Sequence, residues 1–117
     1  MKKKILVIDD DVNVRDYLVS MFEDNGYQVY FAGNVEEGLE QTKTNNPDLI
    51  TLDIEMPGEW GPRFYRQLSQ DAELKDTPVI VISGLCGHQG AVVKAAATFS
   101  KPFDRDKLLK VVKETLN

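Results

Sequence analysis

The chain has 117 residues, enough for one domain that buries roughly two thirds of the surface its unfolded chain would expose. Its formal net charge is −5, and residues 1–60 carry thirteen acids against five bases, whereas residues 61–117 carry six acids against nine bases. This acidic balance, without a cluster of arginines, argues against direct nucleic-acid binding, because neutralising phosphates needs clustered cations.

Features that direct a protein to another compartment are absent from the sequence. The single cysteine, Cys86, cannot form an intramolecular disulfide, which fits a reducing compartment. The start resembles a signal peptide only briefly, because four apolar residues at 5–8 run straight into aspartates. No run approaches the ~20 apolar residues of a membrane span. We therefore expect one domain, residues 1–117, that is cytoplasmic and does not bind a membrane.

The first half of the chain reads as strand, helix, strand, helix and strand. An apolar strand at 5–8 leads into three consecutive aspartates. Apolar residues at positions i, i+3, i+4, i+7 and i+8 then predict an amphipathic helix, which Gly26 closes as a left-handed cap. A short strand at 27–31 follows, and Asn34 is a suitable N-cap for the next helix. The strand at 49–52 then ends in a carboxylate just before a turn.

The second half continues the alternation. A Gly-Pro pair at 61–62 begins a third helix, since proline is tolerated at the first helical position. The continuous apolar run at 79–82 is typical of a strand covered on both faces. A glycine-rich loop, a short alanine-rich helix at 91–97 and a strand at 98–100 come next, and Asp104 caps a last helix. Five strands alternating with five helices predict an α/β fold with one parallel sheet and helices on both faces.

Polar side chains stand at the carboxyl ends of the predicted strands, where parallel sheets bind their ligands. The residues brought to this edge are Asp9, Asp10, Asp53, Ser83 and Lys101. An all-oxygen cluster suits Mg²⁺, which commonly bridges protein carboxylates to a phosphate. The Asp53 carboxylate is a competent nucleophile for phosphorus. Lys101 supplies a positive charge for one phosphoryl oxygen, and the Ser83 hydroxyl is a donor for another.

Four motifs, in this order, resemble the CheY-like receiver domains of two-component response regulators, and the likeness runs from about residue 4 to residue 116. They are the strand and aspartates at 5–11, Asp53 with Met-Pro-Gly at 56–58, the strand that ends at Ser83, and Lys-Pro-Phe at 101–103. The resemblance implies a flavodoxin-like fold, in which a single doubly wound five-stranded parallel sheet has the strand order 2-1-3-4-5.

The resemblance also implies how the site works. Asp53 would accept a phosphoryl group from the phosphohistidine of a sensor kinase or phosphotransfer protein. The implied Mg²⁺ ligands are Asp9, Asp10, Asp53 and the backbone carbonyl of Glu55. Ser83 and Lys101 would contact the phosphate, and the peptide bond before Pro102 would be cis. The domain would then signal to a downstream protein through its fourth helix, fifth strand and fifth helix, without being a turnover enzyme on an external substrate.

Three positions depart from the family pattern. Thr98 stands three residues before Lys101, where the family usually has an aromatic that swings inward on activation, so we expect switching by loop and helix displacement instead. The segment from Ser83 to Lys101 is shorter than usual by about four residues, about one helical turn, which predicts a shortened fourth helix. Trp60 replaces a small polar cap and is either a packing residue or a partner contact.

Simpler roles are expected for several other residues. Asp11 is interpreted as a helix-start acid favoured by the helix dipole. His88 is interpreted as a solvated loop residue and Cys86 as an inert small side chain. Spacing predicts that four aromatic residues belong to the core: Tyr17, Phe22, Phe31 and Phe64.

A different function class uses similar chemistry. A Mg²⁺-dependent phosphatase with an aspartyl nucleophile also has an aspartate at a strand end, and normally a second acid two residues later, where this chain has Glu55. The sequence predicts no cap or substrate pocket for that activity. The sequence also argues against flavin binding, because it has no phosphate-binding loop after the first strand. Since no DNA-binding segment follows Leu116, we favour a signalling domain that acts by protein contact, alone or as a piece of a longer chain.

Overall fold

The computed structural model describes residues 2–53, 66–67, 70, 76–83, 97–100 and 103–116. The elements with defined bounds are β1 (Lys4–Ile8), α1 (Val12–Asp24), β2 (Gln28–Ala32), α2 (Val35–Asn45), β3 (Leu49–Leu52), β4 (Val79–Ser83), β5 (Ala97–Ser100) and α4 (Arg105–Leu116). Every helix in this described part is too short or too polar to cross a bilayer.

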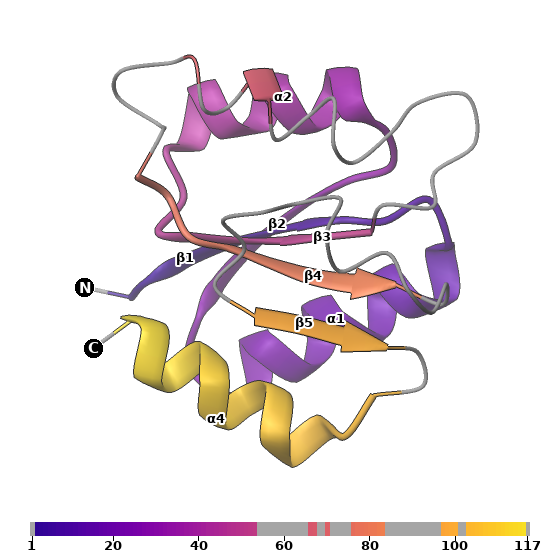
Figure 1. The fold of residues 1–117 in the computed structure, drawn as a ribbon, viewed down its shortest axis with the longest axis vertical. Coiled ribbons are helices and arrows are strands. Elements are labelled where there is room, and N and C mark those ends of the chain that lie inside the picture. Colours follow the sequence, from indigo (N-terminus) through magenta and orange to yellow (C-terminus); the bar gives the residue numbers. More distant parts are fainter. Residues whose placement is uncertain are drawn as a thin grey trace.

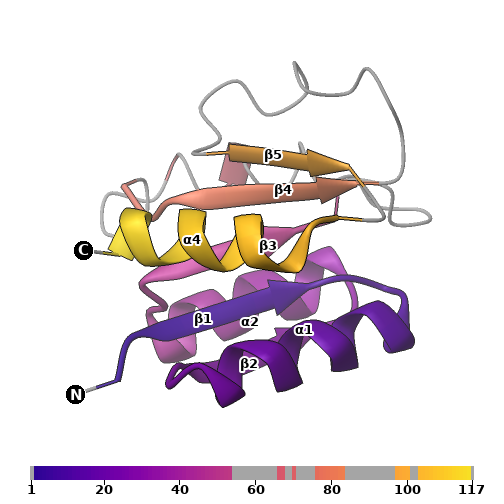
Figure 2. The same ribbon diagram turned by 90° about the horizontal axis from the view of Figure 1, so that it is seen from below.

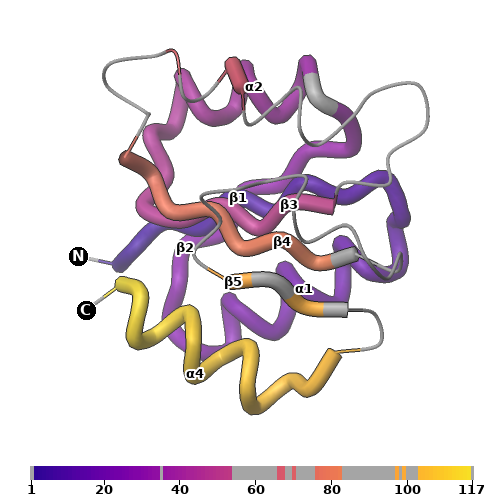
Figure 3. The backbone as a smooth tube through the Cα atoms, in the orientation of Figure 1, coloured from indigo at the N-terminus to yellow at the C-terminus, as the bar shows by residue number. Residues whose placement is uncertain are grey.

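The strands form one parallel sheet in the order β2-β1-β3-β4-β5. Helix α2 covers one face of the sheet, whereas α1 and α4 lie together on the other face (Figures 1 and 2). The prediction of an α/β fold built on a parallel sheet is therefore confirmed. Both ends of the chain lie at the end of the sheet opposite the carboxyl ends of the strands (Figures 1 and 3).

One predicted boundary is wrong. Ala97 was expected to end a helix over 91–97, but it begins β5 and pairs with Ile80 of β4. The high helix propensity of alanine is a weak preference, and pairing with a neighbouring strand overrides it. The rest of that helix, and with it the predicted shortening, lies outside the described residues.

The main core lies between the sheet and the pair α1 and α4. Because successive strand residues face opposite sides, alternate residues of β1 contribute to this core while their neighbours face α2. The core cluster consists of Ile5, Val7, Leu18, Met21, Phe22, Leu49, Ile80, Ile82, Leu108 and Val112. All four residues of β3 are buried, since β3 is covered on both faces. Because β3 lies in the middle of the sheet, the residue that follows it is buried as well.

The predicted N-caps Asn34 and Asp104 are confirmed, and Asp11 also caps a helix. The side-chain oxygens of Asp11, Asn34 and Asp104 accept backbone N–H bonds of 2.8 to 3.3 Å from the first turns of α1, α2 and α4. Gly26 has a φ of +90°, as expected for the residue that closes α1. The carboxylate of Asp11 is therefore a helix cap, which agrees with its interpretation as a helix-start acid.

Two of the four aromatic core predictions are wrong. Phe22 is fully buried as predicted, but Phe31 is 49% exposed and Tyr17 is 45% exposed, and Phe64 lies outside the described residues. Phe31 belongs to β2, which is an edge strand and so lacks a neighbouring strand on its outer side. The guanidinium of Arg15 lies 4.9 Å from the centroid of the Phe31 ring, a cation–π contact that covers part of it.

A buried hydroxyl in the sheet leads to a prediction about stability. Thr51 is buried in β3 between Val7 and Ile80, and its Oγ1 has no hydrogen-bond partner among the described residues. Thr51→Val keeps the shape and removes the unsatisfied group, so we expect the free energy of unfolding to rise by about 1 kcal/mol. Urea unfolding at unchanged m-value measures this change.

Thr42→Val is the matched control. Thr42 is equally buried, but its hydroxyl donates to the carbonyl of Gly38 at 2.7 Å. Valine at 42 removes a satisfied hydrogen bond and should not raise the free energy of unfolding. A loss of stability in Thr51→Val would mean that the Thr51 hydroxyl is satisfied after all.

Candidate functional site

Asp9 and Asp53 are brought together by the pairing of β1 with β3. Ile8, the last residue of β1, is in register with Leu52, the last residue of β3. The backbone N–H of Asp53 donates to the carbonyl of Ile8 at 2.9 Å, which continues the pairing one residue further. Both aspartates therefore leave the sheet at the same edge, and both are buried, with exposed fractions of 2% and 3%.

A third carboxylate joins this pair. Carboxylate oxygens of Asp9, Asp10 and Asp53 all lie within 4.8 Å of one another, with Asp10 exposed to solvent. We call these three residues the aspartate cluster. The backbone N–H of Asp11 donates to Oδ1 of Asp9 at 2.9 Å, which orients that carboxylate.

The chemistry of the aspartate cluster favours a bound cation. Three carboxylates at this separation repel one another, and a cation among them relieves that repulsion. An all-oxygen donor set selects a hard divalent ion over a soft one. The exposure of Asp10 beside two buried acids leaves the cluster open to solvent on one side, as a site that admits an ion and a ligand requires.

The other predicted site residues are placed only in part. Ser83 ends β4, and because Leu52 pairs with Val81, the backbone of Ser83 lies at the same edge of the sheet as Asp53. Its side chain is not among those described. The predicted residues that lie outside the described part of the chain are Glu55, Trp60, Cys86, His88, Lys101 and Pro102. Their assigned roles remain predictions.

Comparison with known proteins decides the family. The sequence model of the response regulator receiver domain matches residues 5–113. The chain belongs to this family. Protein Rrf1 of Nitratidesulfovibrio vulgaris is 34% identical over 116 residues, an alignment that covers 99% of this chain and 84% of Rrf1. The chemotaxis protein CheY of Bacillus subtilis is 31% identical over 124 residues, with all of both chains covered.

A solved structure extends the likeness to the fold. The response regulator TrrA of Thermotoga maritima, crystallised in complex with Mg²⁺ and BeF, superposes with a TM-score of 0.88 at 33% identity. The superposition covers 97% of this receiver domain and 99% of the TrrA chain. The family, the fold and the aspartate cluster together make this receiver domain a signalling module of the two-component type.

The sequence analysis missed one feature of the described residues. A pocket of about 250 Å³ lies between α1 and α4, lined by Tyr17, Ser20, Met21, Asp24 and Arg105. Its α1 residues recur at helical spacing, but Arg105 is far away in the sequence. No motif links the two helices, so the pocket follows only from the way they pack on the sheet.

Proposed function

We propose that this receiver domain is a phosphorylation-activated switch whose phosphoryl acceptor is Asp53 and whose phosphodonor is a phosphohistidine on a sensor kinase or phosphotransfer protein. The observation that carries the proposal is the aspartate cluster, in which the buried Asp53 carboxylate meets two further carboxylates at the end of β3. The family match supports the same role.

The proposed cation is Mg²⁺. Its protein ligands would be the carboxylates of the aspartate cluster together with the backbone carbonyl of Glu55. When bound, Mg²⁺ neutralises negative charge on the phosphoryl group that is transferred. The oxygen-only donor set supports this choice, and so does the solved complex of TrrA with Mg²⁺ and BeF.

The transfer itself would use side chains of this chain. A carboxylate oxygen of Asp53 attacks phosphorus and forms an acyl phosphate, while the P–N bond of the phosphohistidine breaks and its electron pair returns to the imidazole nitrogen. The ammonium group of Lys101 would pair with one phosphoryl oxygen, and the hydroxyl of Ser83 would donate to another. Because the phosphoryl group stays on Asp53, the domain acts as a switch and not as a turnover enzyme.

The proposed output is a change in protein contacts. The segment at 91–96, strand β5 and helix α4 would form the surface that a downstream protein contacts, and residues 84–100 would change position on phosphorylation. The acidic composition supports a protein partner over a nucleic acid. We propose that signalling takes place in the cytoplasm, where sensor kinases present their phosphohistidines.

Replacing Lys101 with alanine tests its proposed role. We expect Mg²⁺ affinity to stay within about twofold of the wild type, since a point charge that pairs with phosphate is not a metal ligand. The spectral response to Mg²⁺ with beryllofluoride should nevertheless weaken. Titration calorimetry measures the affinity, and ¹H–¹⁵N NMR spectra measure the response. Lys107→Ala, an exposed lysine in the first turn of α4, is the control. Loss of Mg²⁺ binding in Lys101→Ala would contradict the assigned role.

Phosphotransfer profiling tests the function as a whole. Autophosphorylated histidine kinases from the host are incubated with the chain, and we expect at least one to transfer its phosphoryl group within seconds to minutes in a Mg²⁺-dependent reaction. Hydroxylamine should remove the label, because it cleaves acyl phosphates. If no kinase transfers label and the chain instead turns over p-nitrophenyl phosphate, a phosphatase function would replace the proposed one.

A further inference from the structure

An aromatic contact joins α1 to the residues that precede α4. The rings of Tyr17 and Phe103 meet edge to face, with centroids 6.0 Å apart and an interplanar angle of 63°. This is a preferred geometry for aromatic pairs. Phe103 is partly buried against the main core, whereas Tyr17 is 45% exposed. The ring of Phe103 is therefore one of the surfaces against which the Tyr17 ring packs.

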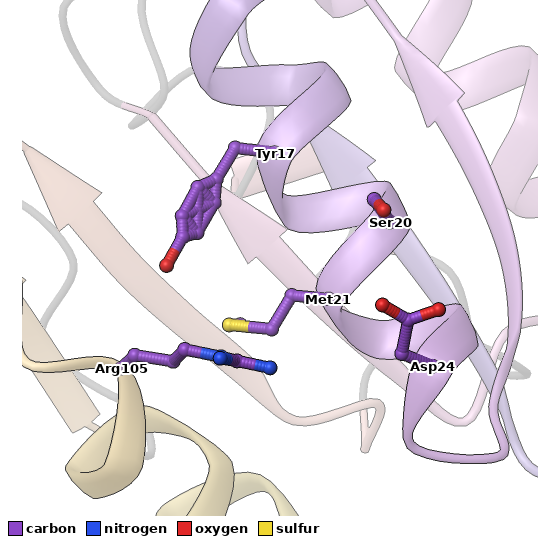
Figure 4. Close-up of a pocket in the computed structure, with 5 residues that line it drawn as sticks. All are labelled: Tyr17, Ser20, Met21, Asp24 and Arg105. Carbon is purple, nitrogen blue, oxygen red and sulfur yellow. The ribbon is translucent and has the colours of Figure 1, made fainter.

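The same two segments form the walls of the pocket between α1 and α4. In Figure 4 the ring of Tyr17 projects from α1, and the side chain of Arg105 extends from the start of α4 past Met21 toward Asp24. Arg105 comes only two residues after Phe103. A shift of residues 103–105 would move one wall of the pocket directly and would move the other wall through the ring of Tyr17.

Phe103 is also tied to the proposed phosphorylation chemistry. It follows Lys101 by two residues, and two residues of backbone span at most about 7 Å. On the other side, Asp104 caps α4 with bonds to the N–H groups of Asp106 and Lys107 at 3.0 and 3.2 Å. Phe103 thus stands between the lysine proposed to contact phosphate and the capped first turn of α4, so that a displacement of residue 101 can be passed on to Arg105.

We propose that the Tyr17–Phe103 contact couples phosphorylation of Asp53 to the shape of the pocket between α1 and α4. The inference rests on the proposed function. Because Thr98 occupies the position where related domains usually carry an aromatic, this pair offers a route that does not depend on residue 98. The surface that responds is the α1–α4 face, which shares α4 with the output surface proposed above and adds α1 to it.

Fluorine NMR of the full chain tests the coupling. The chain has four tyrosines, which can be labelled as 3-fluorotyrosine and assigned by single Tyr→Phe substitutions. On addition of Mg²⁺ with beryllofluoride, we expect the Tyr17 resonance to shift, and Phe103→Leu to lose most of that shift. Tyr27 is the internal control, because it makes a similar edge-to-face contact with Phe22, with centroids 6.2 Å apart, and should not respond.

A second measurement uses the fact that, when two sites are coupled, a change at either one alters the free energy at the other by the same amount. If the aromatic contact differs between the two states, Tyr17→Leu should change the apparent affinity for beryllofluoride by about two- to tenfold, the range expected from the energy of one aromatic pair. Tyr27→Leu should leave that affinity unchanged. Tyr17 is about half exposed and is not part of the core cluster, so its replacement is not expected to prevent folding.

The NMR signals of the backbone amides of residues 9–11 and 53 distinguish a failure of the proposed coupling from a failure of the proposed function. If these amides respond to Mg²⁺ with beryllofluoride while Tyr17 stays silent, or if Phe103→Leu keeps the full Tyr17 shift, the coupling is overturned and the proposed function stands. If the amides themselves do not respond, the proposed function fails, and the coupling fails with it.

Discussion

Asp53→Asn is expected to abolish phosphorylation of the chain. The amide has nearly the shape of the carboxylate, so the buried position at the end of β3 is preserved, but the amide oxygen is not a nucleophile for phosphorus. We expect the rate of phosphoryl uptake from acetyl phosphate with Mg²⁺ to fall by at least about a thousandfold, as is common when a nucleophile is removed. Intact-protein mass spectrometry counts the phosphoryl groups added to each variant.

The matched control lies at the other end of the same strand. Asp48 directly precedes β3, is exposed, and accepts the backbone N–H of Lys4 at 2.8 Å. The side-chain amide oxygen of an Asp48→Asn variant can still accept that bond, so this variant should take up one phosphoryl group at the rate of the wild type. An adduct of equal extent on Asp53→Asn would rule out Asp53 as the acceptor.

Asp10→Asn is expected to weaken Mg²⁺ binding by at least about tenfold. Even the residues that only support metal ligands typically change affinity 10- to 100-fold when mutated, so the loss of a ligand should cost no less. Asp10 is exposed, which means that the substitution removes a carboxylate from the aspartate cluster with little effect on packing. Titration calorimetry with Mg²⁺ in the absence of phosphodonor measures the change.

The neighbouring residue provides the control for Asp10. The carboxylate of Asp11 accepts hydrogen bonds from the N–H groups of Asn13 and Val14, and it is not a member of the aspartate cluster. Asparagine is an equally good N-cap, so Asp11→Asn should bind Mg²⁺ within about twofold of the wild type and stay folded. Equal losses of affinity in the two variants would show that general negative charge, and not a specific ligand, attracts the ion.

Local features of the fold were predictable because their causes lie within a few residues of one another. The caps Asn34 and Asp104 accept hydrogen bonds from N–H groups two or three residues away. The alternation of apolar runs such as β3 with helices is enough to predict a parallel sheet. The candidate site was predictable for a related reason. In a parallel sheet all carboxyl ends lie at one edge, so residues that follow strands, such as Asp9 and Asp53, are brought together.

Other features depended on which strands and helices are neighbours in the folded protein. The sequence did not predict these features. Phe31 was expected in the core, but β2 is an edge strand, so its ring is half exposed. Ala97 was expected in a helix, but pairing with Ile80 holds it in β5. In both cases the outcome depended on whether a strand distant in sequence lies alongside: none lies on the outer side of β2, and β4 pairs with Ala97. Local propensity is too weak to oppose such effects.

The sequence by itself determined the fold class, the family and the identities of the clustered aspartates, because periodicity and motif order are properties of the chain alone. The tertiary structure decided the separations within the aspartate cluster, through the register that pairs Ile8 with Leu52. It also decided the contact of Tyr17 with Phe103 and the pocket beside it. Distances between residues far apart in sequence depend on how strands pair and helices pack, since no local pattern carries that information.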